Sequence, residues 1–258
     1  DKGMDIVIGD SGEITYSVLG AIEVVMTTDH AYGGNDTINA SSGNNIVLGG
    51  FGGDSITTTA GSDIVLGDDG VINYISADGN TDDIDLILSL STTDGGGADD
   101  IDSGSGDDIV IGGRFGDTID TVDGNNLIIG DSGSITAADD NGSRFASLPI
   151  TLGLVETIAF GDGGSDKITT GSGNDIVFGG HNDGSLSDSA DGSVVEVINV
   201  GEGNNIVLGD DGAIDYVRAE REPGVPGADL DASDIDLIVS LSTTAGGGID
   251  DIDSGSGD

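Results

Sequence analysis

The sequence predicts an all-β fold, a parallel β-solenoid in which short strands alternate with glycine-rich turns. Three observations predict it. The chain repeats with a period of nine residues, and each repeat has a glycine- and aspartate-rich half followed by three β-forming residues. The 258 residues include 48 glycines, which supply positive-φ positions for turns. Aspartate far outnumbers glutamate among the 49 acidic residues, and aspartate suits turns, whereas glutamate suits helices.

The charge of the chain excludes several classes of partner. With 6 basic and 49 acidic residues, the formal net charge is −43, so nucleic acid is excluded as a direct partner and anionic membranes are unfavourable. The absence of cysteine removes disulfides, thiol catalysis and cysteine-ligated zinc. No apolar run approaches the ~20 residues of a membrane-spanning helix, so no membrane insertion is expected. We expect the chain to be part of a longer protein.

Three runs of nonapeptides organise the chain. They cover residues 31–75, 94–138 and 161–217, and a polar insertion near 181–191 interrupts the last. Residues 1–17 are the end of another run, and residues 245–258 begin a further one. Connectors at 18–30, 76–93, 139–160 and 218–244 separate the runs. The sequence IDLILSLSTTDGG at 84–96 returns as IDLIVSLSTTAGG at 235–247, so each connector is expected to contribute an apolar strand.

The nonapeptides are of two kinds, and two of them make one coil of 18 residues. One kind has a polar–isoleucine–polar strand, as in Thr37-Ile38-Asn39, and the other is apolar throughout, as in Ile46-Val47-Leu48. Because side chains alternate across a strand, we expect Ile38, Val47 and their equivalents to face each other inside. The first kind of strand then presents polar side chains to water, and the second presents an apolar stripe on its outside.

That outer stripe requires a cover, because a large exposed apolar surface is unfavourable. We expect the cover to come either from the connector strands or from a neighbouring chain. The residues expected to provide it are Leu86, Leu88 and Leu90 in one connector and Leu237, Val239 and Leu241 in another. Copies of the chain, or adjoining repeats, are the partners expected at this stripe.

The crowded aspartates indicate a cation. Each coil buries few apolar side chains against the entropy of ordering its backbone, and negative charge at every turn opposes closure. Carboxylates and turn carbonyls offer only oxygen ligands, which favour a hard cation. Calcium tolerates crowded, irregular oxygen cages better than magnesium.

The repeat resembles a known family. GGFGGDSIT at Gly49–Thr57 fits the nonapeptide G-G-x-G-x-D-x-U-x of the repeat-in-toxin (RTX, haemolysin-type) family at every defined position. SGSGDDIVI and TGSGNDIVF, among others, fit it with one or two substitutions. The resemblance covers more than half of the chain. It implies a right-handed, calcium-loaded parallel β-roll in a bacterial protein that is exported by type I secretion.

In that family the aspartate at the sixth position of the nonapeptide binds calcium together with turn carbonyls. The resemblance implies the ligands Asp5, Asp36, Asp54, Asp63, Asp99, Asp108, Asp117, Asp166, Asp175 and Asp250. The GDSG and GDDG sequences that close the runs offer a second candidate set for ions at run ends, namely Asp68, Asp131 and Asp210, with Asp10, Asp69 and Asp211 in the same sequences. The pattern is broken by Asn45, Asn126 and Asn205, by Glu196, and by Phe115 at a glycine position. Sites at the asparagines are expected to be weaker or differently coordinated.

The expected function is that of an extracellular, calcium-binding structural repeat protein, such as a filament, surface-layer or adhesin shaft, which folds when it meets calcium outside the cell. No serine–histidine–aspartate or similar arrangement is present, so an enzyme is not expected. The alternative is a secretion and folding module of an exported enzyme or toxin. A sugar-binding module is disfavoured, because only 5 phenylalanines and 4 tyrosines are available as aromatic platforms.

Overall fold

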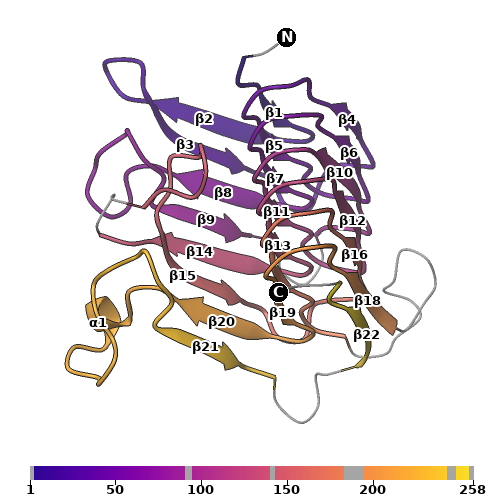
Figure 1. Ribbon diagram of the computed structural model, residues 1–258. Coiled ribbons are helices and arrows are strands. Elements are labelled where there is room, and N and C mark those ends of the chain that lie inside the picture. The colour runs from indigo at the N-terminus through magenta and orange to yellow at the C-terminus, as the bar shows by residue number, and fades with distance from the viewer. Residues whose placement is uncertain (1–2, 91–94, 140–142, 183–194, 243–247, 256–258) are drawn as a thin grey trace.

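The structure is a computed structural model that describes residues 3–90, 95–139, 143–182, 195–242 and 248–255. Three β-sheets form three layers, and the chain visits them in a repeating order (Figure 1). Two layers are parallel sheets of seven strands each, and the third is an antiparallel sheet of eight strands. The three sheets are called A, B and C below.

Sheets A and C are built from the two kinds of nonapeptide. Sheet A holds the apolar strands β1 (Ile6–Ile8), β5 (Ile46–Leu48), β7 (Ile64–Leu66), β11 (Ile109–Ile111), β13 (Leu127–Ile129), β17 (Ile176–Phe178) and β19 (Ile206–Leu208). Sheet C holds the polar–isoleucine–polar strands β4 (Thr37–Asn39), β6 (Ser55–Thr57), β10 (Asp100–Gly104), β12 (Thr118–Thr121), β16 (Lys167–Thr169), β18 (Val195–Asn199) and β22 (Ile249–Asp253). Within a run the chain alternates between the two sheets, and equivalent residues pair in register, as in Ile38 with Ile56.

The space between sheets A and C is filled by the central residue of each strand. Ile38, Ile56 and Ile101 from sheet C belong to one buried cluster with Val47 and Val65 from sheet A. The flanking residues of β4 in sheet C are exposed, whereas β5 in sheet A is buried throughout. The predicted inward-facing isoleucines and valines are therefore confirmed.

Sheet B is antiparallel and was not predicted as a separate layer. Its strands are β2 (Gly12–Tyr16), β3 (Ile22–Thr27), β8 (Gly70–Asn73), β9 (Leu86–Ser89), β14 (Gly133–Ala137), β15 (Leu152–Thr157), β20 (Gly212–Asp215) and β21 (Leu237–Ser240). In each pair the first strand follows a GDSG or GDDG closure and the second comes from the connector. The fifth nonapeptide of each run therefore leaves the parallel sheets, contrary to its expected place in a coil.

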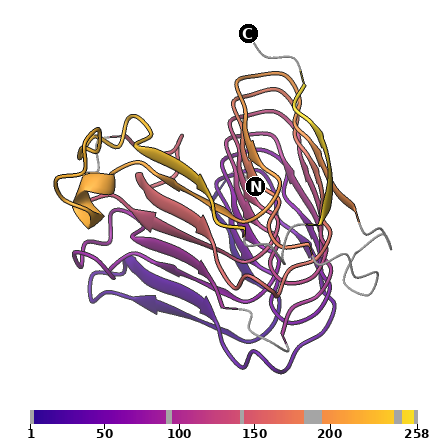
Figure 2. The same ribbon diagram turned by 90° about the horizontal axis from the view of Figure 1, so that it is seen from below.

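Sheet B covers the apolar outer face of sheet A (Figure 2). Ile72, Ile87 and Ile135 from sheet B are fully buried in one cluster with Leu48 and Leu66 from sheet A. The expectation of a connector cover is confirmed, but the predicted face is wrong for β9: Ile87 points inward, while Leu86 and Leu88 are only partly buried. The chain itself therefore covers the stripe, and association with a second copy stays a prediction.

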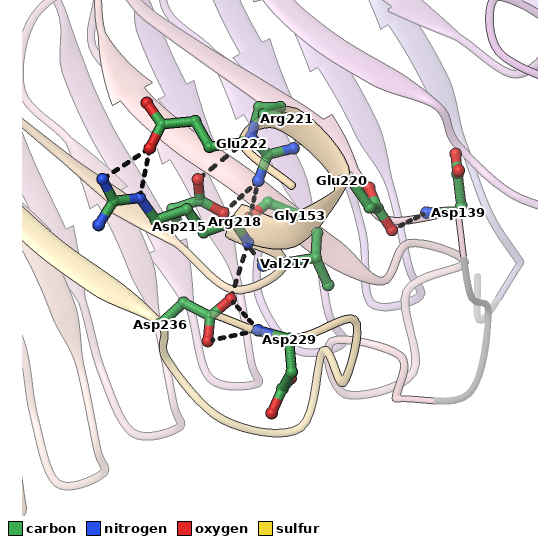
Figure 3. Close-up of polar contacts among 10 residues, drawn as sticks. All are labelled: Asp139, Gly153, Asp215, Val217, Arg218, Glu220, Arg221, Glu222, Asp229 and Asp236. Atoms are coloured by element: carbon green, nitrogen blue, oxygen red, sulfur yellow. Dashed lines mark hydrogen bonds and ion pairs between the residues drawn. The ribbon is translucent and has the colours of Figure 1, made fainter. Parts of the chain in front are cut away.

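The connector at 218–236 is fastened to sheet B by charged contacts (Figure 3). It contains the short helix α1 (Arg218–Arg221). The Arg221 guanidinium donates to both carboxylate oxygens of Asp215 at the end of β20, and the Arg218 backbone N–H donates to Asp236 Oδ2 at 2.8 Å. Glu220 accepts from the backbone N–H of Asp139 at 3.1 Å, which ties this connector to the preceding one. Within the described ranges, no helix is both long and apolar enough to cross a membrane.

Candidate metal centres

The sixth-position residues form two rows, one at each edge where the chain passes between sheets A and C. The row at the entry to the sheet C strands is called the carboxylate row and consists of Asp36, Asp54, Asp99, Asp117, Asp166, Glu196 and Asp250. The row at the entry to the sheet A strands is called the mixed row and consists of Asp5, Asn45, Asp63, Asp108, Asn126, Asp175 and Asn205. The first row is entirely acidic, and the second contains four aspartates and three asparagines.

Five members of the carboxylate row use one side-chain oxygen to accept a backbone N–H, namely Asp54, Asp99, Asp117, Asp166 and Glu196. The backbone N–H of Asp36 donates to Asp54 Oδ1 at 2.7 Å, and that of Asp54 donates to Asp99 Oδ1 at 2.7 Å. The same bond links Asp99 to Asp117, Asp117 to Asp166, and Asp166 to Glu196, at 2.7–2.8 Å. These bonds continue the sheet ladder through the turns, so each residue fixes the position of the coil beside it.

The mixed row forms the same ladder with asparagine as an equal member. The backbone N–H of Asn45 donates to Asp63 Oδ1 at 2.6 Å, and that of Asp108 donates to Asn126 Oδ1 at 3.1 Å. The Asp175 N–H donates to Asn205 Oδ1 at 2.8 Å. An amide oxygen therefore accepts the backbone N–H as a carboxylate oxygen does, and the ladder of hydrogen bonds continues.

The second oxygen distinguishes the two rows. In the carboxylate row it is buried and has no hydrogen-bond partner at six successive positions, Asp36, Asp54, Asp99, Asp117, Asp166 and Glu196. Five of these side chains are at most 2% exposed, and Asp36 is partly buried. A buried anionic oxygen without a partner is strongly unfavourable. Each of these six oxygens would therefore be stabilised by a proton or a cation.

Glycine lines the space beside these oxygens. The residue after every sheet A strand is glycine, and at Gly49, Gly67, Gly112 and Gly130 an added Cβ would come within 3.0 Å of the unpartnered carboxylate oxygen. The same Cβ would meet the carbonyl oxygen of the corresponding glycine in the next coil, as between Gly112 and Gly130. The space beside each orphan oxygen is thus bounded by carboxylate and carbonyl oxygens, which are the ligands that calcium prefers.

The mixed row is closed by protein hydrogen bonds instead. Ser103 Oγ donates to Asp108 Oδ2 at 2.7 Å, and Thr170 Oγ1 donates to Asp175 Oδ2 at 2.7 Å. Each asparagine donates its side-chain amide to a turn carbonyl, as Asn45 does to Ser41 at 2.8 Å. Asp63 is the exception among the described residues of this row, because its Oδ2 is buried without a partner.

Burial and mutual repulsion shift the acid–base behaviour of the carboxylate row. Burial, followed by the charge of Asp36, raises the pKa of Asp54 to about 7. The pKa values of Asp99, Asp117 and Asp166 are raised well above the usual range, mainly by burial and then by neighbouring carboxylates. In the mixed row, burial raises the pKa of Asp108 to about 7, although its bond to Ser103 acts in the opposite direction.

The predicted run-end ligands make different contacts from those of the sixth-position residues. Asp68 accepts the backbone N–H groups of Gly97 and Arg114, and Asp131 accepts those of Gly164 and His181. Both oxygens of each residue therefore anchor turns, and their role as ion ligands stays a prediction. Asp210 differs from them, since its buried Oδ1 has no hydrogen-bond partner. Phe115 adopts a φ of 77°, which confirms that its position favours glycine.

No group of three or more histidine, cysteine, aspartate or glutamate side chains within the described ranges is arranged to hold a metal ion. The donor set that fits an ion here is of another kind, with one orphan carboxylate oxygen and backbone carbonyls of glycine. Asp250 pairs with Glu196 across β18 and β22 and extends the carboxylate row by one position. At the other end of the ladders, the Asp5 N–H donates to Asn45 Oδ1.

The sequence analysis did not separate the two rows. The signal was the residue four positions after each sixth-position residue. It is glycine directly after every sheet A strand, and it is threonine or serine at several sheet C strands, as at Thr58, Ser103 and Thr170. A glycine offers no side-chain donor to the carboxylate, whereas a serine or threonine hydroxyl can donate a hydrogen bond to it.

Comparisons of the chain with models of protein families, with curated proteins and with solved structures found no match.

Proposed function

We propose that this chain is a calcium-binding, extracellular structural repeat protein whose parallel sheets form a right-handed β-roll of the RTX type. Calcium is its ligand, and folding on calcium binding is its mechanism. The observation that carries the proposal is the run of six buried carboxylate oxygens without partners, each next to a glycine turn. Such a row is unstable as bare anions and is matched by a hard cation.

The two side-chain oxygens of a carboxylate-row residue would have different roles. In five members of the carboxylate row one side-chain oxygen accepts the backbone N–H of the neighbouring coil. The other oxygen and the glycine carbonyls would face the ion. Bound calcium would supply the positive charge that offsets repulsion between successive carboxylates. Where calcium is scarce, as inside a cell, that repulsion keeps the chain extended; in millimolar calcium the coils assemble.

Sheet B favours a structural role over that of an accessory module. It adds a third layer along all seven strands of sheet A and buries a second apolar core. A load-bearing shaft, surface layer or filament benefits from such a layer. The alternative function, a secretion and folding module of an exported enzyme or toxin, remains a proposal that only sequence beyond these residues can support.

Circular dichroism during a calcium titration tests the proposal. The β-sheet signal should develop as calcium rises through the ~10⁻⁴–10⁻³ M range typical of extracellular modules, and a chelator should reverse it. Magnesium at equal concentration should not substitute, because it requires a near-ideal octahedral site. An unchanged β-sheet spectrum in the presence and absence of calcium would refute the proposal.

A further inference from the structure

We propose that calcium binds along only one edge of the stacked coils, at the carboxylate row, and that the mixed row is an ion-free edge closed by amide and hydroxyl groups. This inference rests on the proposed function and refines it, because it assigns the ions to one half of the repeat. The resemblance alone implies ligands on both edges, including Asp63, Asp108 and Asp175.

The first argument is the difference in unmet hydrogen bonds. Six successive carboxylate-row side chains have a buried second oxygen without a partner. In the mixed row, Asp108 and Asp175 have theirs bound by Ser103 and Thr170, and among the described side chains of that row the buried second oxygen of Asp63 alone has no partner. An ion that displaced these hydroxyls would have to compensate for two hydrogen bonds that are already made, whereas an ion at the carboxylate row displaces none.

The second argument is the distribution of charge. Asn45, Asn126 and Asn205 occupy every second or third position of the mixed row, so no long series of anions develops there. The Asn126 amide also donates to Asp175 Oδ1 at 3.1 Å, which gives one of the remaining carboxylates a donor. The carboxylate row has no asparagine among its seven members. Repulsion that needs a cation is therefore concentrated on one edge.

The third argument is the shape of the turn. The glycines that face the carboxylate row bring the backbone close to the orphan oxygens, at places where a Cβ would clash with those oxygens. At the equivalent places beside the mixed row the chain has side chains, among them Thr58, Ser103 and Thr170. Asp63 is the exception: Thr58 stands five residues before it, but the Thr58 hydroxyl donates to the carbonyl of Ser103 at 2.6 Å, and Asp63 Oδ2 is buried without a partner.

Two matched substitutions test the inference. Asp117→Asn and Asp108→Asn change one fully buried carboxylate each, in successive nonapeptides, and both keep the Oδ1 acceptor of the ladder. Calcium bound per chain would be measured by equilibrium dialysis with atomic absorption, using calcium alone as the probe. Asp117→Asn should lower the number of bound ions by at least one, and Asp108→Asn should leave it unchanged.

The outcomes separate this inference from the proposed function. Equal losses from Asp117→Asn and Asp108→Asn would overturn the one-edge assignment while leaving calcium binding intact. Absence of bound calcium in the unsubstituted chain would overturn both. Loss of calcium in Asp63→Asn would also contradict the inference, because it would place an ion on the mixed row.

A second pair of variants keeps the test informative if Asp117→Asn does not fold. The triple variant Asp63→Asn/Asp108→Asn/Asp175→Asn makes the mixed row all asparagine apart from Asp5. It should retain the full number of ions and the β-sheet spectrum in calcium. Luminescence of terbium, used as a calcium substitute, would report the same count independently. Reduced terbium binding in this triple variant would overturn the assignment.

Discussion

Glycine at the end of each sheet A strand lets the backbone approach the facing carboxylate closely. At Gly112 an added methyl group would meet Asp117 Oδ2 and the carbonyl of Gly130, and the backbone there cannot move aside without breaking the ladder. Gly34 lies in a turn of the same repeat, yet an added Cβ meets nothing within 4 Å. The two glycines therefore separate the steric effect from the general effect of losing a glycine.

We predict that Gly112→Ala destabilises the calcium-loaded protein by about 1–3 kcal/mol, the usual range for overpacking a tight site. Gly34→Ala should change the free energy of unfolding by no more than about 0.5 kcal/mol. Denaturant unfolding in saturating calcium measures both. Similar effects of the two substitutions would argue against a filled space at Gly112.

The carboxylate row also predicts an unusual response to pH in the absence of calcium. Folding raises the pKa of Asp54 to about 7 from an ordinary value of 3.8, so the folded state binds the proton more tightly than the unfolded state. The resulting stability is fully present below pH 3.8 and is lost as the pH rises through about 7. Chelator-treated protein should therefore recover at pH 5 some of the β-sheet structure that it lacks at pH 8.

In calcium the dependence should reverse over the same window, because protons compete with the ion for the carboxylates. Circular dichroism at a series of pH values, with and without calcium, measures the two trends. A β-sheet signal that grows with pH in the chelated sample would show that burial and neighbouring charge do not raise the pKa values of these acids.

At the scale of the strands, more of the fold could be predicted from the alternating pattern of the nonapeptides than from the connector sequences. Ile38 and Val47 could be placed inside because each strand has a single central residue between two outward ones. The antiparallel pairing of sheet B could not be derived, since it depends on contacts between closures and connectors that are far apart in sequence, as between Ile135 and Ile87. The inward residue of β9 was misassigned because leucine outnumbers isoleucine there.

Ile87 and Leu88 test which face of β9 packs against sheet A. We predict that Ile87→Ala costs about 2–5 kcal/mol, because Ile87 is fully buried between the sheets. Leu88→Ala should cost about 1 kcal/mol or less, because Leu88 lies on the outer, partly exposed face. Chemical unfolding in calcium measures the difference, and a larger effect at Leu88 would show that the strand has the opposite orientation.

The site could be predicted in position but not in detail. The nonapeptide located both rows of sixth-position residues, because every such residue lies at the entry to a strand. It could not show that Ser103 and Thr170 close the mixed row, since this depends on which side-chain oxygen the backbone ladder uses. It also could not show that Asp68 and Asp131 bind turn amides from later coils.

At the scale of the whole molecule, two apolar cores and one row of charge act in opposite directions. The cores between sheets A and C and between sheets A and B hold the layers together. The net charge of −43 and the stacked carboxylates drive the coils apart. The account holds that divalent cations decide this balance, and that the chain without them lacks a stable stack of coils.

Small-angle X-ray scattering in calcium and after exhaustive chelation at low ionic strength tests that claim most directly. Scaling with chain length gives a radius of gyration of about 18 Å for a compact chain of this size and about 56 Å for an unfolded one. We predict a value near the first in millimolar calcium and an approach to the second after chelation. A compact particle with the same radius in both conditions would contradict the account.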